Sequence, residues 1–66
     1  MDEKKRLRIV IRQMIQHNDD HMQDFVTWSS FAEENGMDGV SGVLNEAGKH
    51  VDAATTALRS ALDLLD

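Results

Sequence analysis

The chain contains no cysteine, no proline and no tyrosine, and its aromatic residues are one tryptophan and two phenylalanines. Without cysteine, neither disulfides nor thiolate-bound zinc can stabilise it. Without proline, and with β-branched residues too scattered for alternating strand patterns, the sequence predicts an all-α fold. The 66 residues form one domain, 1–66, and a domain of this size buries only about 60% of the surface of its unfolded chain. We therefore expect its stability to depend on self-association, on a metal bound through nitrogen and oxygen ligands, or on an idealised helical core.

Long apolar runs are also missing, and the longest is Ile9-Val10-Ile11, directly after a basic N-terminus. No segment resembles a signal peptide or a membrane span, so we expect a soluble, cytoplasmic protein that does not bind a membrane. The formal net charge of -5 argues against nucleic-acid binding, which needs a cationic surface. Residues 13–48 contain no Lys or Arg and carry several acidic side chains. This acidic middle favours bound cations, and a solvated acidic face is the alternative interpretation.

Apolar residues recur at helical spacing from Leu7 to Ala32 without a change of phase, and Leu7, Met14, Phe25 and Ala32 fall within one narrow arc. This pattern predicts one long helix, about residues 3–34, with Phe25 and Trp28 in the core. Asn18 and the two aspartates after it are weak helix formers and good N-caps, so a break near Asn18 remains open.

Asn35-Gly36 is a typical helix end. We expect a second helix at about residues 39–65, capped by Asp38 or Ser41. Its small residues Ala47, Ala54 and Ala61 recur every seven positions and favour a close approach of the partner helix.

Two helices of similar length with a short connection predict an antiparallel hairpin. This topology brings the basic residues near the N-terminus close to Asp63 and Asp66. A single contact line between two helices leaves five apolar residues beside it or away from it: Ile9, Ile15, Val26, Phe31 and Leu64. We therefore expect two chains to dimerise into a four-helix bundle. The alternative is a monomeric three-helix bundle with a turn near Asn18.

Histidines carry the functional hypothesis. His17 and His21 are four residues apart and share one side of the predicted helix. Reversal of the chain at Asn35-Gly36 brings His50 level with His21 on the matching flank, with Asp24 and Glu46 one turn away. Three neutral imidazoles and an oxygen ligand suit Zn, Ni, Co, Cu or Fe.

The sequence therefore predicts a small transition-metal-binding carrier, sensor or accessory. In the alternative interpretation, the histidines hydrogen-bond to neighbouring aspartates and bind no metal. The chain is then a helical interaction module that dimerises or docks on a helical protein partner. We do not expect an enzyme, because Ser29 and Ser30 have no histidine within a turn and the glycines lack the Lys-Ser/Thr of a phosphate loop.

The run His17-Asn18-Asp19-Asp20-His21, followed by Asp24-Phe25, resembles small uncharacterised helical modules of prokaryotes. These modules carry a His-Asn-Glu-Glu-His run, a glycine-containing turn and a second, alanine-rich helix. The resemblance covers the layout of most of the chain and implies a helical hairpin. This sequence has aspartates in place of the glutamates, which shortens the reach of the carboxylates.

Overall fold

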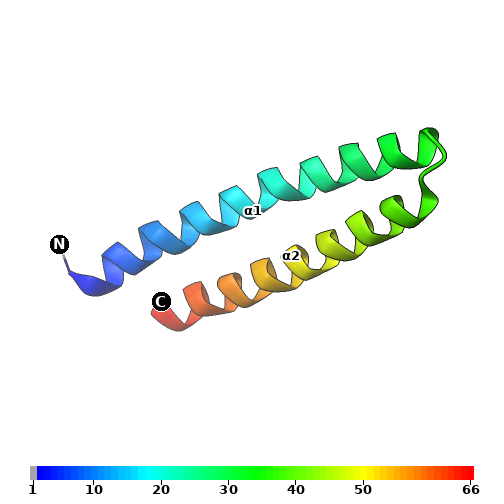
Figure 1. The fold of residues 1–66 in the computed structure, drawn as a ribbon. Coiled ribbons are helices and arrows are strands. Elements are labelled where there is room, and N and C mark those ends of the chain that lie inside the picture. The colour runs from blue at the N-terminus through cyan, green and yellow to red at the C-terminus, as the bar shows by residue number, and fades with distance from the viewer. Residues whose placement is uncertain (1) are drawn as a thin grey trace.

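A computed structural model describes residues 2–66, which form two antiparallel helices joined by a tight turn (Figure 1). Helix α1 spans Glu3–Glu34 and helix α2 spans Asp38–Leu65. The hairpin measures 51 × 16 × 11 Å and has a radius of gyration of 15.3 Å, against about 11 Å for a globular domain of this length. The predicted all-α hairpin is confirmed, with both helices within one residue of their expected bounds. The shape is a rod only two helices wide.

Helix α1 begins at a side-chain cap and continues without a break to its end. The Asp2 carboxylate accepts a hydrogen bond from the backbone N–H of Lys5, at 2.8 Å, which satisfies one of the free amides of the first turn. At Asn18 the helix continues, because this side chain bonds across the hairpin instead of capping a new helix. Its Nδ2 donates to Oγ1 of Thr55 at 3.2 Å. The structure therefore does not support the three-helix alternative.

The turn is built around Gly36, whose φ of +75° lies in the left-handed region that favours glycine. The Met37 amide donates to the Ala32 carbonyl at 2.8 Å and the Gly36 amide to Glu33 at 3.1 Å, the two bonds of a Schellman motif. Helix α2 then starts from Met37, which provides no side-chain cap. The expectation that Asp38 or Ser41 caps this helix was wrong, because both already lie within it.

The two helices contact each other along one line, which we call the seam. On each helix, the residues of the seam are spaced alternately three and four positions apart. All of its members are buried or half-buried. They are Arg8, Ile11, Ile15, Asn18, Met22, Phe25, Ser29 and Ala32 on α1, and Ser41, Leu44, Gly48, Val51, Thr55, Leu58, Leu62 and Leu65 on α2. Several are small or polar, and no side chain among residues 2–66 is fully buried. One hairpin thus has only a thin core.

This seam differs from the predicted one. Leu7 and Met14 are about half exposed, and Trp28, expected in the core, is 55% exposed. These three side chains lie to one side of the seam, while Ile15, expected beside it or away from it, is half-buried within it. Polar Asn18 and Thr55 occupy the middle of the seam, so the predicted apolar arc was rotated away from the true contact line.

The open end of the hairpin joins opposite charges. Arg8 donates from Nη2 to the Leu65 carbonyl at 2.9 Å, and its Nε lies 3.3 Å from Oδ1 of Asp66. The expected approach of the basic N-terminus to the acidic C-terminus is confirmed for this pair. Because Asp66 is largely exposed, the ion pair contributes at most about 1 kcal/mol.

Candidate functional site: an apolar face with central histidines

The hairpin has two broad faces of opposite character. On each helix, the residue directly before every seam position points to one face and the residue directly after it points to the other. Because the helices are antiparallel, the preceding residues of both helices share one face. We call it the apolar face. It comprises Leu7, Val10, Met14, His17, His21, Asp24, Trp28 and Phe31 of α1, with Val40, Val43, Ala47, His50, Ala54, Ala57, Ala61 and Leu64 of α2.

The opposite face, which we call the charged face, consists of the residues that follow the seam positions. It carries Arg12, Asp19, Glu33, Lys49, Asp52, Arg59, Asp63 and Asp66 among its sixteen positions, and its only aliphatic side chains are Ile9 and Val26. By contrast, the apolar face has no Lys or Arg, and its polar members are three histidines and one aspartate. The chain is therefore amphipathic as a hairpin and not only helix by helix.

Large side chains of the apolar face stand in solvent. Leu64 is 88% exposed and Val43 71% exposed. Near the turn, the Trp28 and Phe31 rings meet edge to face with centroids 5.5 Å apart, so the two rings form one exposed aromatic cluster. Soluble monomers rarely expose contiguous apolar surface of this kind without using it for binding.

His17 and His21 lie side by side at the middle of α1. Their rings are stacked, with centroids 4.5 Å apart and planes inclined by 23°. They line a shallow hollow of about 440 Å³ on the outer side of α1 together with Gln13, Gln16, Asp20 and Asp24. Gln16 donates to Oδ1 of Asp20 at 3.3 Å, which holds one carboxylate at the rim. Three of the predicted ligands, His17, His21 and Asp24, thus line the same hollow.

The other two predicted ligands lie apart from this hollow. His50 is on the apolar face of α2 and does not line it. Glu46 lies on the outer edge of α2, where its carboxylate is 3.8 Å from Nζ of Lys49. Within residues 2–66 of one chain, no three His, Asp or Glu side chains are grouped closely enough to hold a metal ion.

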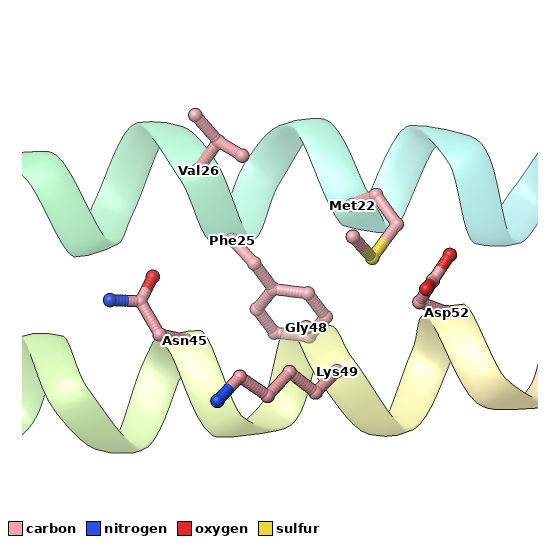
Figure 2. A pocket seen from close by; sticks show the side chains of 7 residues that line it. All are labelled: Met22, Phe25, Val26, Asn45, Gly48, Lys49 and Asp52. Atoms are coloured by element: carbon pink, nitrogen blue, oxygen red, sulfur yellow. The ribbon is translucent and has the colours of Figure 1, made fainter.

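A second shallow hollow, of about 390 Å³, opens where the seam meets the charged face (Figure 2). Figure 2 shows the Phe25 ring reaching from α1 across Gly48 of α2, with Lys49 and Asp52 at the rim. A Cβ atom at Gly48 would lie 3.7 Å from Cβ of Phe25. This contact was not predicted from the sequence. It could have been predicted from the spacing of the seam residues, which places Gly48 opposite the large aromatic side chain of Phe25.

Neither helix in the described part of the chain has a stretch long and apolar enough to span a bilayer. No curated protein and no solved structure matches the chain. A family model does match, over residues 7–65, which run from the first residue of the apolar face, Leu7, to the last seam residue, Leu65. The chain belongs to the family described as a domain of unknown function (DUF8180).

Proposed function

We propose that the chain is a non-catalytic, homodimerising helical module. Two hairpins stack through their apolar faces and form a four-helix bundle. The observation that carries this proposal is the segregation of exposed apolar residues onto one face of the hairpin, from Leu7 at one end to Phe31 and Val40 at the other. In the bundle this face becomes the core that a single hairpin lacks.

The exposed area supports one further copy as the occupant of the face. The chain has a mass of 7.4 kDa and exposes 4993 Å², whereas a folded monomer of this mass exposes about 4,200 Å². The excess is about 800 Å², which is close to what each partner buries in a standard protein–protein interface. A second hairpin therefore matches the uncovered area without any additional partner.

The distribution of side-chain size on the face supports a particular stacking. Its α1 half is bulky, with Trp28 and Phe31 at one end and Leu7 and Met14 at the other, while its α2 half carries four alanines. Bulky side chains pack best against small ones. We infer a twofold axis parallel to the helices, so that α1 of each copy lies over α2 of its partner. Both turns are then at the same end of the bundle.

Self-complementarity favours a second copy over an unrelated helical protein. An isologous interface requires one patch to fit itself, and a face with one bulky half and one small half meets this requirement. The alternative, docking on a foreign helix, leaves half of the face uncovered.

Sedimentation equilibrium of the untagged protein at micromolar concentrations tests the proposal. We expect a dimer for the native chain and a monomer for Val43→Glu, which places a charge within the proposed interface. Losing burial of Val43 in both copies removes about 3 kcal/mol or more, which weakens dimerisation at least about 100-fold.

The matched control is Val26→Glu, the same substitution on the charged face, at a side chain that is 57% exposed. It should leave the dimer intact. A native chain that sediments as a monomer would overturn the proposal and favour a foreign helical partner. Equal weakening by both substitutions would show that the apolar face is not the interface.

A further inference from the structure

We propose that dimerisation completes a transition-metal site between the two copies. His17 and His21 of one chain bind the ion together with the partner's His50, which gives two equivalent sites per dimer. This inference deepens the proposed function and rests on the inferred stacking of α1 over α2.

His17 and His21 are arranged as a chelating pair. A separation of four residues places two imidazoles on one helix face, the spacing that helical metal sites use. Here the rings are stacked 4.5 Å apart, so both project from the helix in the same direction. Two imidazoles are only half of a tetrahedral ligand set, and no third ligand group is available in residues 2–66 of the same chain.

The partner provides the missing imidazole because all three histidines lie near the middle of their helices. His17 and His21 flank the midpoint of α1, Glu3–Glu34, and His50 is next to the midpoint of α2, Asp38–Leu65. A twofold axis parallel to the helices lays the middle of α1 over the middle of the partner's α2. The histidine pair of each copy then faces His50 of the partner subunit, once on each side of the axis.

Packing alone does not explain histidines at the centre of this face. In the described chain, no hydrogen bond joins the ring of His17, His21 or His50 to another residue. Covering these rings with apolar side chains would leave their nitrogens unsatisfied, which is costly. A bound ion satisfies one nitrogen of each ring.

The local charge suits a divalent cation. The apolar face has no Lys or Arg to repel an ion, and the carboxylates of Asp20 and Asp24 line the hollow beside the histidine pair. Asp24, on the same face, is placed to accept a ring N–H from a ligating histidine. Three imidazoles with a water oxygen as the fourth ligand suit Zn, Ni, Co or Cu in the divalent state.

Native mass spectrometry and calorimetric titration of the untagged protein with Zn²⁺ and Co²⁺ test the site. We expect two ions per dimer. His50→Gln and the double variant His17→Gln/His21→Gln should each weaken binding at least about tenfold while the protein remains dimeric. Asp19→Asn is the matched control, because it removes a carboxylate next to the histidines but on the charged face, and it should bind like the native chain.

A mixing experiment distinguishes a shared site from a site within one chain. Dimers of His50→Gln alone, or of the double variant alone, lack every complete site. A mixed dimer retains one, made of His17 and His21 from the first chain and His50 from the second. We expect one tightly bound ion per mixed dimer and none in either parent.

Several results would overturn the inference. The first is that mixed dimers bind no more metal than either parent, and the second is that His50→Gln binds metal like the native chain. The third is that a monomeric variant such as Val43→Glu binds the metal stoichiometrically. A native dimer that binds neither ion would remove the metal site and leave the dimerisation proposal standing. A monomeric native chain would remove both.

Discussion

Glycine-to-alanine substitutions give the sharpest test of the seam, because three glycines of this chain occupy three different environments. Gly48 is buried within α2, and an alanine Cβ there would lie 3.7 Å from Cβ of Phe25 and 3.9 Å from Sδ and Cε of Met22. These are ordinary van der Waals distances, so the methyl group fits without displacing either neighbour. Alanine also favours the helix over glycine by roughly 0.5–1 kcal/mol. Gly48→Ala should therefore raise the free energy of unfolding by about 1 kcal/mol.

Gly42 and Gly36 are the matched controls. Gly42 lies in α2 on the charged face with no neighbour near its Cβ position, so Gly42→Ala isolates the helix-propensity gain. Gly36 has a φ of +75°, where a side chain costs about 1–2 kcal/mol. Gly36→Ala should consequently destabilise the hairpin.

Thermal unfolding followed by circular dichroism measures all three variants, at one fixed chain concentration because association shifts the midpoint. For a domain of this size, 1 kcal/mol corresponds to a change in Tm of about 4–8 °C. We expect increases for Gly48→Ala and Gly42→Ala and a decrease for Gly36→Ala. A decrease for Gly48→Ala would refute the reasoning, because it would mean that α1 and α2 approach more closely at Phe25 than the structure has them.

Two further substitutions test the local interactions of the hairpin. Asp2→Ala removes the cap of α1 and should lower the free energy of unfolding by about 0.5–2 kcal/mol, measured by urea titration, and a stability equal to that of the native chain would contradict the capping role. Asn18→Ala leaves the buried Thr55 hydroxyl without its partner and should cost about 1 kcal/mol. The double variant Asn18→Leu/Thr55→Val should recover that loss, and failure to do so would show that the two side chains do not act as a pair.

Local signals in the sequence were sufficient for the element bounds and the topology. The start of α1 needs a side chain that accepts a hydrogen bond from a free amide, and Asp2 provides it. The end of α1 needs a residue in the left-handed conformation, and Gly36 provides it. The rotation of the helices about their axes was harder to predict. Asn18 and Thr55 can occupy the seam because they form a hydrogen bond with each other. The spacing of apolar residues along one helix does not reveal a hydrogen bond to the other helix.

The candidate site was predictable only in part for the same reason. The spacing of His17 and His21 determines their stacking, which is a local property of one helix. The position of His50 relative to His17 and His21 depends on the rotation of each helix about its axis and on the shift of one helix along the other. In the structure His50 lies on the same face as His17 and His21 but does not line their hollow. Glu46 was placed by its distance along the chain, but it projects from the outer edge of α2 toward Lys49.

The charged face has a consequence for the size of the proposed assembly. In a face-to-face pair, the side chains of Arg12, Asp19, Asp52 and Arg59 point outward on both surfaces of the bundle. A third hairpin would have to pack its apolar face against the guanidinium and carboxylate groups of a charged face. These groups would lose their bound water and gain no hydrogen-bond partners, which is unfavourable. In the proposed dimer, growth would therefore end at the closed pair, and no open-ended filament would form.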